Sequence, residues 1–536
     1  MKKILAFILS AVMLFSIVAC SSAYDDYEKY IEIGDLKGIT IDESKILKKV
    51  SDTILEIREN AREDLWVKLD AATAVAQKGD KLDIDYDVKS YYDPDNKDLK
   101  LSAETLKNMK ASAYSLILGS NSFISEYTVK DDPDNVRNNK GFEDQLIGAT
   151  VNSNDTDDAS KDDKIEVTVT FPDVYKDATL QKVIVTFEVT VNSISRSIAD
   201  LTDKELLATL KYTFTDPDAN QDADDDSSDN EGDAATAAEE TQGEDNAEND
   251  VKFTDLFKGG ELKIDFSEED LGKFSTIFDV KTVFDALSGK VLYEEFSVVF
   301  TVPSEEDLKA DKDDEDKNDK FVPYAGREIT VNFTLNKLTK LPEWNDEFVA
   351  KQTSDNFKTV KEYEKDLYDT SAQNIVLSAI IDAAVFKEVP WKETKSAYKL
   401  ALKNAVISAL NQALNSTTNS VSIGDFTQKD FDKYITAEVY AALREQAAED
   451  SVKTIKTRLV YEYLFDKLDI KLSNKEYKAK LKEEFETNKA YYSYLGLSKA
   501  SQVEKYFGKD SLVVDFKYEM LLDKVVELVT INTAEA

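Results

Sequence analysis

The stretches KIEVTVTFPDVY (residues 164–175) and VIVTFEVTVNSI (residues 183–194) decide the fold of the central part of this chain. Apolar and polar residues alternate along both with period two, which is typical of a β-strand that buries one face. KGDKLDIDY (residues 78–86) alternates in the same way, and YSLILGSNSFI (residues 114–124) and GFEDQLIG (residues 141–148) lie between these stretches. The sequence therefore predicts strand, strand, short helix, strand, strand. Aromatic and aliphatic side chains, rather than acids or bases, recur where the segments converge.

The composition limits the classes of function. With 536 residues the chain exceeds a single hydrophobic core and should form about three or four domains. It carries 106 acidic against 67 basic residues, a formal net charge of −39, so nucleic acid and anionic lipid headgroups are not expected as partners. Histidine is absent, which removes Ser-His-Asp hydrolysis and the usual zinc sites. No nucleotide-binding glycine motif occurs, and no cofactor is expected.

The first twenty residues have the pattern of an export signal. Lys2 and Lys3 precede a short apolar run over residues 4–18, and Ile17-Val18-Ala19-Cys20 resembles a bacterial lipobox. Cys20, the single cysteine, would then be the lipidated first residue of the mature protein; the alternative is an ordinary signal peptide with an incidental cysteine. No later stretch reaches the length of a membrane span. We therefore expect an exported protein, anchored by lipid to the outer face of the bacterial cytoplasmic membrane.

Other segments outline the organisation of the chain. Helical spacing of apolar residues covers residues 41–60 and dominates from residue 341 onward. Residues 216–250 hold 15 acids and no Lys or Arg, which predicts a disordered acidic segment. Asp216, Asp218 and Asn220 match the opening of a calcium loop, but Gln221 replaces its glycine and Ser227 its closing glutamate, so solvated turns are favoured over calcium.

The second half of the central region repeats the first in shortened form. KGGELKIDF (residues 258–266) echoes residues 78–86, FDALSG (residues 284–289) echoes residues 142–148, and FSVVFTVP (residues 296–303) echoes residues 167–172. Residues 329–335 echo residues 185–191. Because the order is preserved, we predict a tandem repeat. The counterpart of residues 114–124 is not recognisable, so the second copy is expected to keep the sheet and lose the pocket.

The set and order of segments between residues 78 and 194 resembles an FKBP-type peptidyl-prolyl isomerase domain, of the version found in bacterial trigger factor. Residues 341–362 and the last ~90 residues resemble the helical chaperone domain of that family. The resemblance implies an α+β protein with an FKBP-like antiparallel sheet and crossing helix, a degenerate second FKBP-like unit and an all-α C-terminal chaperone domain. The expected boundaries are a signal peptide (1–19), a tether and linker helix (20–78), the isomerase domain (79–196), a short helix with the acidic linker (197–252), the degenerate repeat (253–340) and the helical domain (341–536).

The resemblance also implies an aromatic pocket. Its residues are Tyr86 closing the first strand, Tyr114 leading the second, Phe123 and Ile124 whose backbone holds the substrate, Phe142 at the floor, Tyr175 at the rim and Phe187 in the final strand. Each of them also suits a plain core position of a half-buried sheet, and their joint occurrence favours the pocket. A polar insertion, residues 125–140 with Pro133, is expected to cap the pocket or to displace Phe142. Asn152–Asp163 lengthens the next turn.

The resemblance favours a peptidyl-prolyl isomerase and folding chaperone for unfolded or proline-containing secreted polypeptides. Prolyl isomerisation needs no acid, base or metal, which agrees with the residues at hand. The alternative is a holdase or scaffold whose FKBP-like units bind without catalysis. A solute-binding lipoprotein would instead alternate strands and helices. Nothing in the sequence corresponds to the family's ribosome-binding domain, so no ribosome partner is expected.

Overall fold

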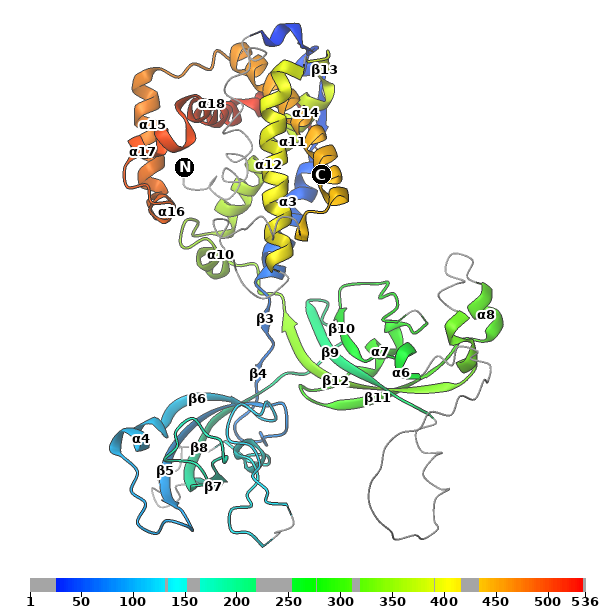
Figure 1. Ribbon diagram of the computed structural model, residues 1–536, viewed down its shortest axis with the longest axis vertical. Coiled ribbons are helices and arrows are strands. Elements are labelled where there is room, and N and C mark those ends of the chain that lie inside the picture. Colours follow the sequence, from blue (N-terminus) through cyan, green and yellow to red (C-terminus); the bar gives the residue numbers. More distant parts are fainter. Residues whose placement is uncertain are drawn as a thin grey trace, which may run out of the picture. The chain divides into compact units, whose positions relative to one another are not determined.

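The computed structural model describes residues 26–130, 134–151, 164–217, 253–275, 277–310, 319–389, 391–415 and 433–533 (Figure 1). The predicted signal peptide, Cys20, and nearly all of the acidic segment lie outside the described residues. The chain divides into two compact units, residues 59–342 and the two chain ends, residues 1–58 with 343–536. Among the described helices, none has both the length and the apolar character that a membrane crossing requires.

The first sheet has five antiparallel strands. These are β4 (Val67–Lys68), β5 (Lys81–Tyr92), β6 (Ala111–Ile117), β7 (Ile165–Thr170) and β8 (Ile184–Arg196). β5 lies between β6 and β8, and the other edge of β8 pairs with β7 along its first half and with β4 at its end. The short helices α4 (Ala103–Asn108) and α5 (Phe142–Gln145) complete this domain. The strands predicted from period-two alternation are thus confirmed as β5, β7 and β8.

The second sheet has the same topology. Its strands are β3 (Glu63–Asp64), β9 (Leu206–Thr215), β10 (Gly260–Asp265), β11 (Glu295–Thr301) and β12 (Glu328–Lys340). β9 lies between β10 and β12, and the other edge of β12 pairs with β11 and, at its end, with β3. Helices α6 (Phe253–Leu256), α7 (Val280–Ala286) and α8 (Glu305–Ala310), and the 3-10 helix η3 (Asp319–Tyr324), accompany it. The predicted tandem repeat is therefore present.

The ladders align the two sheets residue by residue. The β5–β8 pairing skips Asn192 and the β9–β12 pairing skips Asn336, so both long strands carry an irregularity at an asparagine. Gly148 donates its N–H to the carbonyl of Ala76 at 2.8 Å, and Gly289 donates in the same way to Ala199 at 2.9 Å. In this alignment β9 takes the place of β5 and β10 that of β6.

Two assignments predicted from the sequence, one of secondary structure and one of strand correspondence, are wrong. Residues 206–215 form β9 rather than a short helix in a linker, and residues 258–266 contain the counterpart of β6, not of β5. Leu and Ala favour helices locally, but every second side chain of β9 from Leu206 to Leu210 is buried in the sheet, and this burial decides the structure. Residues 218–252 therefore belong between two paired strands of the second sheet, and are not a linker between domains.

The domains are nested along the chain. β3 pairs with β12 before the chain enters the first sheet at β4, and the second sheet resumes only after β8. We name residues 66–196 the first sheet domain, and residues 59–65 with 197–341 the second sheet domain. The predicted start of the first domain at residue 79 was too late, because β4 already pairs with β8 and Leu69 donates its N–H to Ile194 of β8 at 2.9 Å.

The helical unit is built from both chain ends. Its helices are α3 (Glu43–Asn60), α10 (Asp346–Gln352), α11 (Val360–Ala383), α12 (Trp391–Asn415), α14 (Ala437–Lys467), α15 (Asn474–Thr487), α16 (Lys489–Tyr494), α17 (Ala500–Phe507) and α18 (Lys509–Val525). Ile46 of α3 is buried in one core with Leu459 of α14, so α3 belongs to this unit rather than to a linker. The unit is not all-α, since β1 (Ile31–Glu32) pairs with β13 (Val385–Phe386) and β2 (Thr40–Asp42) with β14 (Thr530–Asn532).

Candidate functional site: an aromatic cluster in the first sheet domain

Five of the seven predicted site residues meet in one cluster. The ring of Tyr86 lies within 6.0 Å, centroid to centroid, of those of Tyr114, Phe123, Phe142 and Phe187. These contacts are edge-to-face, the arrangement that the aromatic quadrupole favours. Alternation along β5 and β8 aims Tyr86 and Phe187 at the same side of the sheet, while the N-terminus of α5 supplies Phe142.

The floor of this cluster is covered by a neighbouring ring. Phe142 and Phe187 are 0% and 1% exposed, whereas Tyr86, Tyr114 and Phe123 are half-buried. The ring of Phe123 lies 4.1 Å from that of Phe142, which is the shortest ring separation in the cluster. Phe142 is therefore closed from solvent, and the ring of Phe123 is its nearest aromatic neighbour. The backbone contact with the substrate that the resemblance implies for Phe123 stays a prediction, and the side chain of Phe123 lies against the floor ring.

The remaining two predicted residues lie at the margin. Tyr175 packs edge-on against Phe171, 4.8 Å between centroids, and is half-buried at the edge of the same core. Burial, and after it the neighbouring hydroxyls of Tyr114 and Tyr175, raise the pKa of the Tyr86 hydroxyl. Ile124 is half-buried, and its carbonyl accepts a hydrogen bond from the Phe142 N–H at 2.8 Å.

The insertion at residues 125–140 does not displace Phe142. Tyr127 and Asn139 exchange backbone hydrogen bonds of 2.9 and 3.0 Å, so the inserted chain leaves and returns at one point. Together with the bond from Phe142 to Ile124, this closes the insertion at its base. The displacement expected for Phe142 is therefore wrong. Pro133 lies outside the described residues.

The insertion is fastened beside the rim. The Tyr127 hydroxyl donates to Asp173 at 2.7 Å, two residues before Tyr175. Arg137 donates to both Asp93 and Asp95 at 2.8 Å, so these two acids of the DPDNKD segment (residues 93–98) pair with a guanidinium. Among the described residues, no group of three or more Asp, Glu, Cys or His side chains is arranged to hold a metal ion.

Glu143 organises the approach to the cluster, and the sequence analysis missed it. Its carboxylate is 5% exposed and accepts four backbone N–H groups at 2.8–3.1 Å. The donors are Gly119, Asn121, Ser122 and Phe123. We call residues 118–123 the pocket loop. Because Glu143 follows Phe142 directly, one helix start fixes both the floor ring and the loop that covers it. The only available indication in the sequence was an acid beside the floor aromatic.

The second sheet domain keeps the ladder but fills the corresponding space. Tyr212 matches Tyr86 in register, while Val283 of α7 takes the place of Phe142, since each lies six residues before its matched glycine. The rings of Phe274, Phe278 and Phe300 contact one another at 4.8–6.1 Å between centroids and occupy this core. The predicted loss of the pocket in the second copy agrees with this packing.

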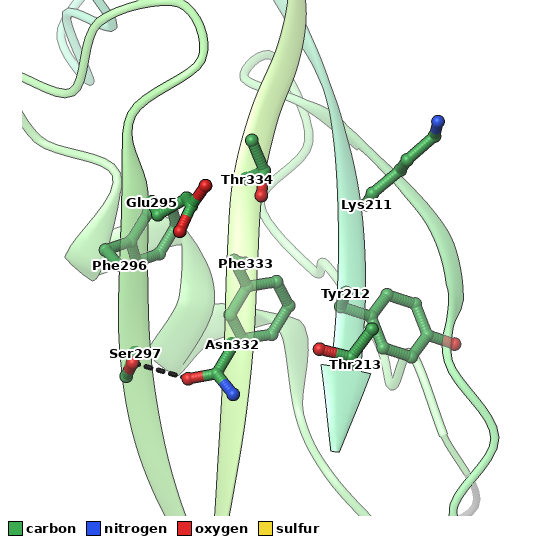
Figure 2. Close-up of a pocket in the computed structure, with 9 residues that line it drawn as sticks. All are labelled: Lys211, Tyr212, Thr213, Glu295, Phe296, Ser297, Asn332, Phe333 and Thr334. Carbon is green, nitrogen blue, oxygen red and sulfur yellow. Dashed lines mark hydrogen bonds between the residues drawn. The ribbon is translucent and has the colours of Figure 1, made fainter. Parts of the chain in front are cut away.

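A different hollow lies on the second sheet. It has a volume of about 450 Å³ and is bordered by β9, β12 and β11 (Figure 2). Its residues are Lys211, Tyr212, Thr213, Glu295, Phe296, Ser297, Asn332, Phe333 and Thr334. Asn332 at its centre already accepts from Ser297 at 2.7 Å and donates to Thr215 at 2.8 Å. The hollow is shallow, mostly polar, and separate from the aromatic cluster.

In the helical unit, α12 and α14 border a hollow of about 260 Å³. Small and apolar side chains of α12 supply most of its wall, among them Ala397, Leu400, Ala401 and Ala405. Trp391, at the first position of α12, is 57% exposed. This unit therefore offers apolar surface besides its closed cores.

Comparison with known proteins gives partial matches. No protein-family model matches the chain. The trigger factor of Enterococcus faecalis is 30% identical over 179 residues, which cover 32% of this chain and 32% of that protein. The trigger factor of Lactiplantibacillus plantarum is 30% identical over 177 residues, 32% of this chain and 31% of the relative. That of Rhodospirillum rubrum is 36% identical over 107 residues, 20% of this chain and 18% of the relative.

A solved chain, described for promiscuous substrate recognition in folding and assembly activities of the trigger factor chaperone, overlaps 64% of this chain and 76% of its own length. The sequence identity is 14% and the TM-score 0.18, which is too low to compare the overall folds. The similarity in sequence covers about a third of the length of the curated relatives, and within that extent the chain is similar to trigger factors.

Proposed function

We propose that this protein is a folding chaperone that catalyses the cis–trans isomerisation of X-Pro bonds in secreted polypeptides. The observation that carries the proposal is the convergence of Tyr86, Tyr114, Phe123, Phe142 and Phe187 in the first sheet domain. The partial similarity to trigger factors supports a chaperone. The hollow between α12 and α14 adds apolar surface on which an unfolded segment can rest.

The chemistry fits a site without acids or bases. The barrier to rotation, ~18–20 kcal/mol, comes from amide resonance. The twisted transition state loses this resonance and becomes less polar, so a dry aromatic surface favours it over the planar ground state. Aromatic rings that exclude water, with hydrogen bonds from the rim to hold the peptide, suffice. No proton transfer or covalent intermediate is required.

A second candidate is a holdase that binds without turnover. The cover of Phe123 over Phe142 favours it, because a closed floor gives no ground-state contact to a proline ring. In that case the two sheet domains are binding modules, and the helical unit binds the unfolded client polypeptide.

One experiment separates the two. The rate of isomerisation of a proline-containing tetrapeptide is measured with the full chain and with the variants Phe142→Ala and Tyr175→Ala. We expect catalysis in the parent and a loss of at least about tenfold in both variants, a transition-state effect of ~1.4 kcal/mol or more. Val283→Ala, at the equivalent position of the second sheet domain, is the matched control and should keep the parent rate. A parent without catalysis that still suppresses aggregation of a denatured client supports the holdase.

The location is also proposed. Export and lipid attachment at Cys20 would place the protein at the outer face of the cytoplasmic membrane, where secreted chains emerge unfolded. Metabolic labelling with a fatty acid tests this. Label in the parent and none in Cys20→Ala is expected, and a cytoplasmic, unlabelled parent would contradict it.

A further inference from the structure

The two sheet domains meet at a glycine that no other residue can replace without movement. A Cβ atom on Gly79 of the first sheet domain would lie 1.9 Å from the carbonyl oxygen of Leu292 in the second. Gly79 also has a φ of +88°, and Leu292 is 5% exposed. The neighbouring Lys78 forms an ion pair of 3.9 Å with Glu295. Backbone thus approaches backbone at this point, which only glycine permits.

This contact continues into the pocket loop. Gly79 donates its N–H to the carbonyl of Leu118 at 2.8 Å, and Leu118 donates to Asp80 at 2.9 Å. The side chain of Lys78 lies across Gly119, with its Cγ 2.9 Å from the position of a Cβ there. Gly119 is also the first of the four backbone donors to Glu143. The interdomain contact and the carboxylate therefore hold the same loop from two sides.

Tyr293 brings the second sheet domain close to that carboxylate. It follows Leu292, has a φ of +60°, and donates its N–H to Leu335 at 2.7 Å, so its own sheet fixes it. Burial raises the pKa of the Tyr293 hydroxyl, and the carboxylate of Glu143 is the next cause. The phenol thus lies within the electrostatic reach of the group that binds the pocket loop.

We propose that the second sheet domain controls access to the aromatic site of the first, with Leu292 and Tyr293 as positioning residues that hold the pocket loop and keep Phe123 over Phe142. The predicted change in KM rests on the proposed isomerase activity, whereas the predicted change in hydrogen exchange of the pocket loop does not. The second sheet domain has the same fold without an open site, and here it acts as a regulator of its partner. A proline segment displaces Phe123 from Phe142, and the interdomain contact determines how much free energy this movement of the pocket loop requires.

The kinetic consequence has a defined sign. If only a fraction of molecules has an uncovered floor, the apparent dissociation constant of a ligand exceeds the intrinsic one by the inverse of that fraction. Loosening the contact raises the open fraction, so KM falls while kcat changes little. A loss of fold would instead reduce the amount of active protein, lowering the apparent kcat at unchanged KM.

The test compares two glycines of the first sheet domain in the full chain. Gly79→Ala introduces strain and the clash with Leu292, whereas Gly148→Ala, at a φ of +92° with no atom within 4 Å of the added Cβ, introduces strain alone. Tyr293→Asn, in the other domain, removes the ring and suits the left-handed backbone, so it remains informative if Gly79→Ala does not fold. Hydrogen exchange is followed at the four amides that donate to Glu143, alongside isomerisation of the tetrapeptide.

We expect faster exchange of these amides in Gly79→Ala and Tyr293→Asn than in Gly148→Ala, with KM lowered by about threefold or more and kcat within about twofold. The inference is overturned if amide exchange is unchanged in both variants. It is also overturned if the parent is catalytically active and the KM of both variants equals that of the parent. An inactive parent refutes the proposed isomerase, while the exchange measurement still decides whether the second domain holds the loop.

Discussion

The two sheet domains share a ladder and differ in what lies against it. Both have five antiparallel strands in the same order, an irregularity at an asparagine of the longest strand, and a helix at the same connection. At matching positions the first domain has Phe142 and the second Val283, and in the second the rings of Phe274, Phe278 and Phe300 pack together instead. The backbone pairing sets the topology, and a few side chains decide whether a site forms on it.

The domains also differ in buried charge. Asp80, 0% exposed, receives two hydrogen bonds of 2.7 Å from Arg196, and Glu143 binds the pocket loop. In register, Leu206 replaces Asp80 and Lys340 replaces Arg196 in the second domain. Buried charges contribute little net stability and restrict geometry, so they are expected where the geometry matters. Their concentration in the first domain agrees with a site there.

The largest effect should come from breaking the buried ion pair. Arg196→Met leaves the carboxylate of Asp80 buried without its guanidinium, which costs ~3–5 kcal/mol. Lys340→Met, at the matching position, removes half-exposed pairs with Asp203 and Glu205 and should cost ~0–1 kcal/mol. Urea unfolding of the full chain measures both. Equal losses in the two variants would show that the two domains do not differ in this respect.

Glu143→Gln should have the next largest effect. Its amide nitrogen meets N–H donors where a carboxylate oxygen accepted them, so at least one donor loses its bond, at a cost of ~1–3 kcal/mol. Lys281 is the second residue of α7, as Glu143 is of α5, but it pairs with Asp285 at the surface, and Lys281→Gln should change stability by less than about 0.5 kcal/mol. The midpoint of urea unfolding is compared. A larger loss in Lys281→Gln would contradict the expectation that the buried carboxylate of Glu143 contributes more to stability than the surface pair of Lys281.

Excision of residues 218–252 tests their place within the second sheet. β9 and β10 pair directly, Tyr212 opposite Gly260, so a short turn can join them. Closing a shorter loop costs less entropy, and the shortened chain should be more stable by ~1–2 kcal/mol. A matching excision of residues 94–109 between β5 and β6 removes α4 and Asp95, one of the two acidic partners of Arg137, and should destabilise the first sheet. Unfolding of the second sheet after the first excision would refute its strand order.

The sequence predicted which rings lie together better than it predicted the connectivity of the strands. Period-two alternation identified β5, β7 and β8, and motif positions identified the five clustered rings, because both depend on local patterns. Strands of two residues such as β3 and β4 have no periodicity to detect, so the nesting of the domains was not visible. β9 was missed because its leucines and alanine suit a helix, and KGGELKIDF resembles KGDKLDIDY although it forms the next strand.

The contacts of Glu143 and Phe123 were beyond sequence reasoning for a different reason. A carboxylate beside an aromatic residue has no spacing that reveals four backbone donors 20 to 24 residues earlier. Whether Phe123 lines the pocket or covers its floor depends on a few ångströms of loop position. Such outcomes arise from tertiary packing and not from local preference.

The smallest effect concerns a pair of glycines that should behave alike. Gly148 and Gly289 occupy matching positions in the turns that follow α5 and α7, with φ of +92° and +73°. A Cβ added at either glycine meets no atom within 4 Å. Each change to alanine should therefore cost only the left-handed strain, ~1–2 kcal/mol, and the two losses should agree within ~0.5 kcal/mol. Urea unfolding followed separately for each sheet, by hydrogen exchange, gives the two values. A clear inequality would mean that the equivalence of the two ladders ends at this turn, whereas equal losses extend it from the strands to the connection that positions the helix and, in the first domain, the floor of the site.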